Sequence, residues 1–234
     1  MLYYMNIVLL IRSYNRPEYL EKTLESVLKS DINLCIKRYI YDDGSDNNDT
    51  ISILNNEKYV NVNSKEFKVI FNDSNVKCKQ SYIDALTYLK EKHSNDCLIC
   101  TIDNDVNVKS SFIQEITDKY TEAFNFYNHR KILFTGFNSS NTHKNNKNYE
   151  ENSHFKDFYR KTSMGGVNFI FHSSFIDEIV TSWSGRVDWG VVKYMNNNNY
   201  PMLCFKKSIL NHIGEIGIWS RKGRYDHDKD FNNN

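Results

Sequence analysis

The chain has 234 residues, of which 40% are hydrophobic and 25% are charged, a composition typical of a globular protein that buries a core. Its 30 basic and 29 acidic residues leave a formal net charge of +1, which excludes a global field that would recruit nucleic acid or an anionic membrane surface. Any phosphate binding must therefore be local. The first apolar run, Met1 to Ile11, falls well short of the ~20 residues needed to cross a bilayer, so we expect no transmembrane segment.

The first 136 residues alternate two kinds of pattern. Five apolar runs predict buried strands, at residues 6–13, 36–41, 67–71, 98–102 and 132–134. Helical spacing predicts helices between them, from Pro17, from a cap at Ser45 or Asp46 to about Asn56, and over residues 77–92 and 110–127. Strands separated by helices imply parallel pairing, with ligands at the carboxyl ends of the strands. We therefore expect an α/β fold with a mostly parallel, twisted sheet flanked by helices.

The pattern changes after residue 136. Residues 139–152 are rich in Asn, Lys and His without an apolar period, which predicts a surface loop, and Gly165-Gly166 leads into a strand that ends near Phe171. Short helices and short strands are expected in the rest, at residues 173–183, 187–196, 202–205 and 208–212. The polar stretch from residue 217 to residue 234 is expected to be mobile.

The five cysteines are odd in number and lack paired spacing, which argues against a disulfide framework. Cys97 and Cys100 lie within a predicted strand, where an offset of three puts them on opposite faces, so we interpret them as core thiols. A glycosylation sequon at Asn48 follows the second predicted strand, whose carboxyl end is expected to face the ligand, and a glycan there would obstruct binding. These features favour a cytoplasmic protein.

Two strand ends carry acidic residues. Asp103 and Asp105 close the fourth apolar run, and residues i and i+2 of a strand point to the same side, so both carboxylates can face one point. Such a pair suits a hard divalent cation that also binds phosphate oxygens. Asp42 and Asp43 close the second run. Acids at these positions also cap turns, and Asp-Gly is ordinary turn chemistry, so that structural alternative stays open.

A third motif, Arg12-Ser13-Tyr14-Asn15-Arg16-Pro17, closes the first strand and opens the first helix. The amino end of a helix with an arginine beside it can hold an anionic diphosphate. Exposed arginines are common, however, and they require no ligand. The three motifs together predict a metal-dependent enzyme that acts on a nucleotide-activated substrate, most simply a sugar.

The three motifs, in this order and spacing, resemble the pattern of glycosyltransferase family 2 on a GT-A fold. The motifs are Ser13-Tyr14-Asn15-Arg16-Pro17 followed by Leu20, Leu24 and Ser26, then Asp42-Asp43-Gly44-Ser45, then Asp103-Asn104-Asp105. The resemblance covers about half the chain. It implies transfer of a sugar from a nucleoside diphosphate donor, usually UDP-linked, to a hydroxyl. It also divides a single domain into a nucleotide-sugar-binding half at 1–136, an acceptor and catalytic half at 137–216 and a tail at 217–234.

The resemblance assigns roles to the donor-side residues by position. Ser13, Asn15 and Arg16 would line the base and the diphosphate. Asp43 would accept a hydrogen bond from the uracil ring nitrogen, with Asp42 in support. The Asp103-Asn104-Asp105 segment would place Asp103 near the ribose, Asn104 against the donor and Asp105 on Mn²⁺ or Mg²⁺.

One departure concerns the loop before the third helix, at residues 75–80. The family commonly has a glycine there, which this chain lacks, so the backbone path of the loop is open to question. Lys79 in this loop is a candidate phosphate contact.

The acceptor side is assigned from the second half. Asp188 is the candidate catalytic base that removes the acceptor hydroxyl proton, with an N-cap for a helix starting at Trp189 as its structural alternative. Trp189 offers an apolar face to a sugar, and Gly166 would allow close approach of the acceptor, although a plain turn is equally consistent. His212, in a His-Ile-Gly segment similar to one in related transferases, is a candidate third metal ligand with Asp103 and Asp105. The basic segment from Trp219 to Lys222 could close over the diphosphate.

We therefore interpret the chain as a metal-dependent, inverting glycosyltransferase. Its expected partners are a UDP-sugar donor and a glycan, glycoprotein or other hydroxyl acceptor, without nucleic acid. Two alternatives remain. One is a non-catalytic sugar-binding domain that keeps the GT-A-like fold. The other is an aspartyl-phosphate phosphatase, which also uses a DxD motif but usually places it on its first strand.

Overall fold

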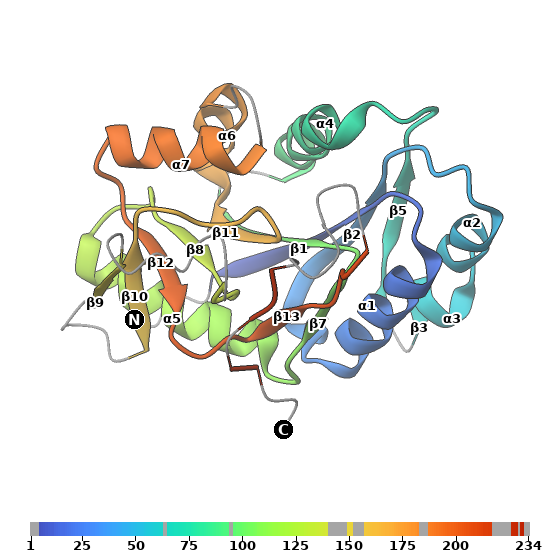
Figure 1. Ribbon diagram of the computed structural model, residues 1–234, viewed down its shortest axis with the longest axis horizontal. Coiled ribbons are helices and arrows are strands. Elements are labelled where there is room, and N and C mark those ends of the chain that lie inside the picture. Colours follow the sequence, from blue (N-terminus) through green and yellow to red (C-terminus); the bar gives the residue numbers. More distant parts are fainter. Residues whose placement is uncertain are drawn as a thin grey trace.

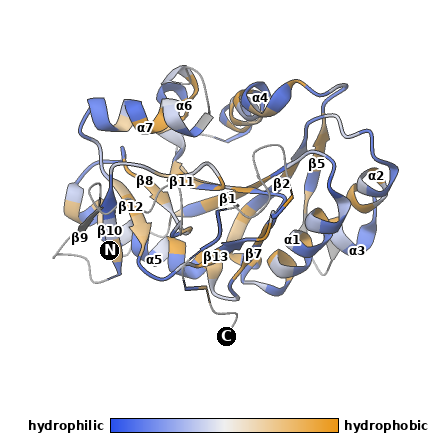
Figure 2. Cartoon of the chain, viewed as in Figure 1, coloured by the Kyte–Doolittle hydropathy of each residue, from blue (hydrophilic) through white to orange (hydrophobic). Residues whose placement is uncertain are grey.

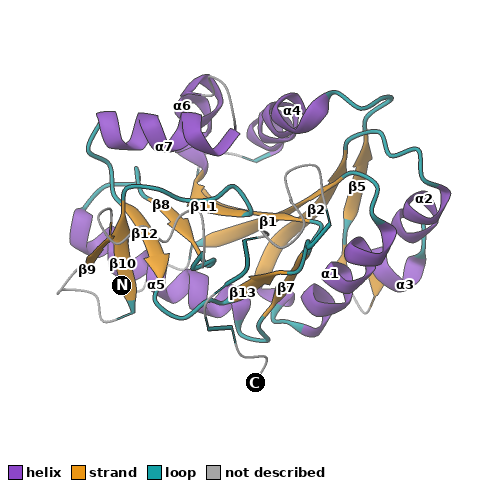
Figure 3. Ribbon diagram, viewed as in Figure 1, coloured by secondary structure: helices purple, strands orange, loops and turns teal. Residues whose placement is uncertain are grey.

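The computed structural model describes residues 5–62, 65–93, 96–139, 149–151, 157–182, 187–216, 226–228 and 230–231. Within these residues, nine strands form one mixed sheet that is crossed by helices on both faces (Figures 1 and 3). The strands in spatial order are β5 (Lys68–Phe71), β2 (Cys35–Asp42), β1 (Asn6–Ser13), β6 (Cys97–Asp103), β11 (Asn168–His172), β8 (Leu133–Thr135), β12 (Met202–Phe205), β10 (Phe158–Lys161) and β9 (Tyr149–Glu151).

The first four strands of this order run parallel to one another, as their separation by helices predicts. Beyond them, β11 runs antiparallel to both β6 and β8, and β12 returns parallel to β8. Two small antiparallel pairs lie outside the main sheet. They are β13 (Leu210–His212) with β7 (Val106–Val108), and β3 (Asn61–Val62) with β4 (Lys65–Glu66).

The helices divide between the two faces of the sheet (Figure 1). They are α1 (Pro17–Lys29), α2 (Asn48–Leu54), α3 (Glu57–Val60), α4 (Lys77–Lys92), α5 (Phe112–Tyr127), α6 (Ile176–Ser182) and α7 (Val187–Asn197), with short 3₁₀ turns at Ile32–Leu34 and Ser173–Phe175. Helices α1 and α5 lie on one face, and α4, α6 and α7 lie on the other.

Strand β1 shows why both faces are covered. Ile7, Leu9 and Ile11 belong to the core cluster that contains the apolar residues of α1 and α5, whereas Val8 and Leu10 belong to the cluster with α4, α6 and α7. Successive side chains of a strand point to opposite faces, so an unbroken apolar run needs helices on both. Figure 2 shows the same pattern, with hydrophobic strands between helices that are hydrophilic outside. The predicted α/β fold is confirmed.

Two local predictions differ from the structure. Helix α2 is capped by Asn47, whose side chain accepts a hydrogen bond from the Thr50 amide at 3.0 Å, and not by Ser45 or Asp46. The Ser45 hydroxyl is already engaged, because it donates to Asp42 at 2.7 Å. The predicted surface loop at 139–152 contains strand β9, which is paired to β10 at the edge of the sheet. Short edge strands have weak apolar periodicity, which hides them in the sequence.

Candidate active site

The motif residues meet at one edge of the sheet. In the strand registers, Arg12 of β1 lies opposite Asp103 of β6, and Ser13 lies opposite Asp42 of β2. Because the three strands are parallel, the loops that leave their carboxyl ends lie side by side. The Asp43 amide donates to the Ser13 carbonyl at 2.8 Å. The Ser13 hydroxyl is buried and has no hydrogen-bond partner among the described residues, which leaves it available to a ligand.

Asn15 connects the loops after β1, β2 and β6. Its side-chain oxygen accepts hydrogen bonds from the amides of Asp46 at 3.2 Å and Asn47 at 3.0 Å, and its carbonyl accepts one from the Asn104 side chain at 3.1 Å. Asn15 and Arg16 both have left-handed backbone angles, with φ of 50° and 61°. Such strain persists only where the surroundings hold it, and here three loops do so. Asn15 and Asn104, both expected at the donor, therefore shape the edge itself.

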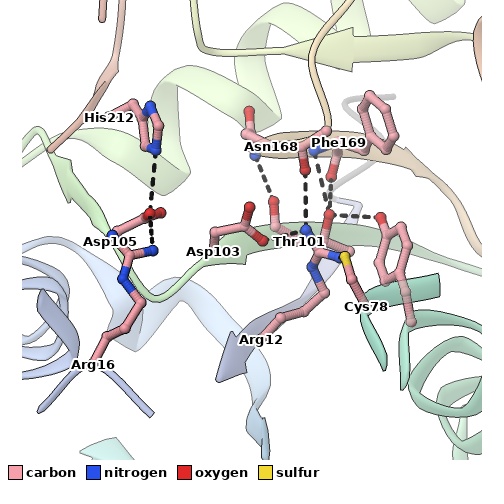
Figure 4. A network of polar contacts seen from close by, with 11 residues as sticks. Arg12, Arg16, Cys78, Thr101, Asp103, Asp105, Asn168, Phe169 and His212 are labelled. Atoms are coloured by element: carbon pink, nitrogen blue, oxygen red, sulfur yellow. Dashed lines mark hydrogen bonds and ion pairs between the residues drawn. The ribbon is translucent and has the colours of Figure 1, made fainter. Parts of the chain in front are cut away.

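Asp105 is a buried carboxylate with two side-chain partners (Figure 4). It is 5% exposed, and its Oδ2 accepts a hydrogen bond from Arg16 Nη1 at 2.6 Å. His212 Nε2 lies 3.2 Å from the same oxygen. The other oxygen, Oδ1, is buried and has no hydrogen-bond partner among the residues that the structure describes. A buried carboxylate oxygen without a partner is costly, so this atom marks a place for a ligand.

The orientation of His212 is set by its other nitrogen. His212 Nδ1 lies 2.6 Å from the Asp226 backbone carbonyl, which can only accept, so Nδ1 carries a proton. Nε2 faces the Asp105 carboxylate, which also only accepts, so the contact between them is a hydrogen bond in which Nε2 carries the second proton of an imidazolium. Loss of that proton would free the Nε2 lone pair for a metal ion while the Asp226 carbonyl still holds Nδ1.

Asp105 and His212 perturb each other's ionisation. Burial alone would lower the pKa of His212, but the Asp105 carboxylate raises it above its ordinary value. Burial alone would raise the pKa of Asp105, but the nearby His212 and Arg16 hold it below its ordinary value. Asp105 is thus an anionic carboxylate that lies between two cationic side chains, His212 and Arg16.

Asp103 has a different partner. Its Oδ1 forms an ion pair with Arg12, whose guanidinium also donates to the Gly166 carbonyl at 3.2 Å. Burial raises the pKa of Asp103 to about 6, even though Arg12 opposes that shift, and the Asp105 charge adds to it. The structure therefore places Asp103 beside Arg12, and Asp105 beside His212.

The two acids after β2 have separate surroundings. Asp42 is fully buried and accepts hydrogen bonds from the amide and the hydroxyl of Ser45, at 2.8 and 2.7 Å, so it builds the turn. Asp43 is 4% exposed and accepts hydrogen bonds from the side chains of Asn72 at 3.2 Å and Asn75 at 3.0 Å. The structural alternative thus describes Asp42 well, whereas Asp43 is fixed by a loop that faces the same edge.

The loop without the family's glycine keeps the backbone that a glycine would favour. Lys77, the first residue of α4, has a left-handed φ of 74°. The Val76 amide donates to Asp43 at 3.0 Å, which anchors the loop at this point. The loop therefore places a non-glycine residue in a left-handed conformation beside its anchor on Asp43. Lys79, two residues further, is partly exposed in the first turn of α4.

The acceptor-side candidates lie together. Asp188 is in the first turn of α7, which begins at Val187, and its carboxylate accepts a hydrogen bond from the Trp189 amide at 2.9 Å. A Cβ atom placed on Gly166 would lie 3.5 Å from the Asp188 Cβ. Trp189 is 44% exposed. Because the Gly166 carbonyl binds Arg12, these residues connect to the Arg12–Asp103 pair.

The donor set fits a divalent cation in part. Asp105 Oδ1 and His212 Nε2 offer a carboxylate oxygen and an imidazole nitrogen, which suit Mn²⁺. Asp103 is turned to Arg12, and in the described part of the chain no three acidic, histidine or cysteine side chains gather to hold a metal ion. Any cation here would take its remaining ligands from the diphosphate and water, so the residues fit a metal that arrives with a donor.

Three residues have roles in the site that the sequence does not predict. Arg12 belongs to the motif that closes the first strand, but its ion pair with Asp103 was not predicted. Gly214 packs so closely that a Cβ there would lie 2.1 Å from Asp105 Oδ2, and the His-Ile-Gly segment pointed to it only indirectly. Asp226 acts through its backbone, for which no sequence signal exists. Residues 217–225, including the predicted closing segment, lie outside the described residues.

Solved structures share this architecture, which is the GT-A fold. GalNAc-T7, crystallised with UDP, GalNAc and Mn²⁺, matches with a TM-score of 0.66 and 14% identity over 94% of this chain and 45% of that chain. TarS of S. aureus matches with a TM-score of 0.57 and 14% identity over 88% of this chain and 36% of that chain. The chain thus spans less than half the length of either protein, and likeness at this identity shows the fold alone. No curated protein sequence matches this chain.

The sequence goes further than the fold. The family model described as Glycosyl transferase family 2 matches residues 9–180, so the chain belongs to this family. The matched range contains all three motifs, whereas Asp188 and His212 lie beyond it. In the described residues, no helix is long and apolar enough to span a membrane.

Proposed function

We propose that this protein is a metal-dependent glycosyltransferase that moves a sugar from a UDP-linked donor to an acceptor hydroxyl with inversion. One observation carries the metal dependence. The buried Asp105 Oδ1 lacks a partner in the described residues, and it belongs to the carboxylate whose other oxygen lies 3.2 Å from His212 Nε2. Family membership supports the reaction class, and the Mn²⁺ and UDP bound to GalNAc-T7 support the choice of cation and nucleotide.

The donor half, residues 1–136, binds and orients the nucleotide in this proposal. Asp43 accepts from the uracil ring, Asp103 binds the ribose, and Asp105 with His212 holds Mn²⁺ or Mg²⁺. The bound cation neutralises charge on the leaving diphosphate. The remaining donor contacts would come from Ser13, Asn15, Arg16, Asn104 and Lys79, with Asp42 supporting the turn.

The acceptor half supplies the base. Asp188 removes the proton of the acceptor hydroxyl as its oxygen attacks the anomeric carbon, with Gly166 and Trp189 against the acceptor. Attack from the face opposite the diphosphate gives inversion. The acceptor is a glycan, a glycoprotein or another hydroxyl compound. All five cysteines are free, which supports a cytoplasmic location.

A thermal-shift screen of nucleoside diphosphate sugars, with and without Mn²⁺, tests the proposal. A ligand that binds the native state raises its stability by mass action, so a UDP-sugar with Mn²⁺ should give the largest shift. Slow hydrolysis of that UDP-sugar should follow, which a non-catalytic sugar-binding domain would not perform. The absence of any Mn²⁺-dependent shift with uridine nucleotides would refute the proposal.

A further inference from the structure

Arg12 lies near the carboxyl end of β1, at the edge of the sheet where the nucleotide donor is proposed to bind (the donor edge). Its side chain is 12% exposed, and its guanidinium carbon lies 4.3 Å from the centre of the Tyr82 ring. Its Nε is buried and has no hydrogen-bond partner among the described residues. Taking a guanidinium out of water costs free energy that specific partners must offset, so its contacts are informative.

The guanidinium contacts three segments that are far apart in sequence (Figure 4). It forms the ion pair with Asp103 at the end of β6, donates to the Gly166 carbonyl before β11 at 3.2 Å, and lies 3.7 Å from the Cys78 sulfur in α4. Nη2 donates to both Asp103 and Gly166 while Nη1 faces Cys78, and a lysine ammonium reproduces such a planar arrangement less well. The Arg12 guanidinium thus holds the Asp103 carboxylate from one side.

Fixing one oxygen of Asp103 leaves the other for a ligand. Arg12 pairs with Oδ1, while no described residue donates a hydrogen bond to Oδ2, and the Asp103 side chain is 27% exposed. A carboxylate oxygen held in place and open to solvent can accept hydrogen bonds from neighbouring hydroxyl groups.

Building on the proposed function, we propose that Arg12 is a positioning residue that holds Asp103 so that its free oxygen accepts from the ribose hydroxyls of the donor. Arg12 itself does not touch the nucleotide. The Gly166 contact braces the guanidinium against the acceptor-side loop, which restrains the Asp103 carboxylate. Selectivity for ribose over a deoxygenated sugar therefore depends on Arg12.

A ligand-modification cycle tests this inference. Calorimetry with Mn²⁺ would measure the affinity of UDP and of 2′,3′-dideoxyuridine diphosphate for wild type, Arg12→Met and Asp103→Asn. Arg12→Met keeps an apolar stem against Tyr82 but removes the fork. Hydrogen bonds to a charged group predict that wild type prefers UDP by about tenfold to hundredfold. In Arg12→Met this preference should fall to about threefold or less, with the affinity of the dideoxy analogue almost unchanged.

Two further variants keep the test decisive if Arg12→Met folds poorly. Arg12→Lys retains the charge without the fork and should lose most of the preference for UDP. Arg38→Met is a matched control, because among the described residues Arg38 of β2 donates only to the backbone carbonyls of Ile32 and Cys35. It should keep the full preference even if its melting temperature falls.

The outcomes separate the inference from the function on which it depends. The positioning role is overturned if an Arg12 variant keeps the wild-type preference for UDP. It is also overturned if the variant loses affinity for UDP and for the dideoxy analogue by the same factor. A wild type that binds both ligands equally also overturns it and removes Asp103 from the ribose, but leaves the proposed sugar transfer in place. A wild type that binds neither ligand refutes the proposed function as well.

Discussion

Gly214 offers the sharpest test of the Asp105–His212 arrangement. An alanine there would place its Cβ 2.1 Å from Asp105 Oδ2, 2.8 Å from His212 Nε2 and 2.9 Å from Arg16 Nη2. Real Cβ atoms essentially never approach a neighbour closer than 3.0 Å, so the carboxylate must retreat by 0.9 Å, the difference between 3.0 and 2.1 Å. Gly214 does not have a left-handed φ, so the backbone tolerates alanine and the effect is confined to the site.

The size of the effect follows from that displacement. A misplacement of about 1 Å at a reacting centre costs roughly a hundredfold in rate, equivalent to about 2.7 kcal/mol. We expect Gly214→Ala to lower Mn²⁺-dependent turnover and the affinity for UDP with Mn²⁺ by this order. Turnover with a UDP-sugar and calorimetry with UDP and Mn²⁺ would measure the two effects.

Gly136→Ala is the matched control. A Cβ on Gly136 would lie 2.4 Å from the Ile209 Cγ1 atom, so this clash falls on an apolar side chain instead of on Asp105. Overpacking of this kind costs about 1–3 kcal/mol of stability, and it should leave the affinity for UDP with Mn²⁺ nearly intact. If Gly214→Ala bound UDP and Mn²⁺ like wild type, or if both variants lost affinity in proportion to stability, the reasoning would fail.

Three more outcomes follow from the site. Asp105→Ala should abolish the Mn²⁺ dependence of UDP binding in calorimetry, whereas equal affinity with and without Mn²⁺ in wild type would contradict its role. Asp188→Asn should abolish transfer and leave UDP binding nearly intact, and unchanged turnover would remove Asp188 from the mechanism. Burial alone would lower the pKa of His212, but Asp105 raises it above 6.5, so the metal-free protein should lose this stabilisation as pH rises through the raised value. Over the same window UDP binding with Mn²⁺ should strengthen, because a ligating imidazole must be neutral, and His212→Asn should flatten both melting and calorimetric profiles.

The sequence predicts the strands and their common edge because both follow from local patterns. The run at 6–13 is apolar on both faces and needs helices on both sides, and parallel strands then place Ser13 beside Asp42. The spacing of Asp103 and Asp105 predicts that they converge. The spacing does not predict that Asp103 pairs with Arg12 or that Asp105 pairs with Arg16 and His212. These ion pairs depend on side-chain packing between segments that are distant in sequence.

The cap of α2 shows the same limit at short range. Ser45, Asp46 and Asn47 are all acceptable caps by residue type. Ser45 is excluded only because its hydroxyl donates to the buried Asp42 and accepts from the Asn15 amide at 2.7 Å. Those contacts form the turn that follows β2 at the donor edge. Competing demands of the site, rather than helix propensity, thus decide where the helix starts.

Very little secondary structure holds Asp105 and His212 together at the edge of the sheet. His212 reaches Asp105 because β13 pairs with β7, in a register that sets His212 opposite Val106, the residue after Asp105. The Ile213 amide then donates to the Asp105 carbonyl at 2.8 Å. Three-residue strands are weak on their own, so the proximity of His212 and Asp105 depends on the tight turn at Gly214 and on the hold of Asp226 on the imidazole. Cation binding between these residues would in turn stabilise the β7–β13 pair, since any ligand that binds only the folded arrangement favours it.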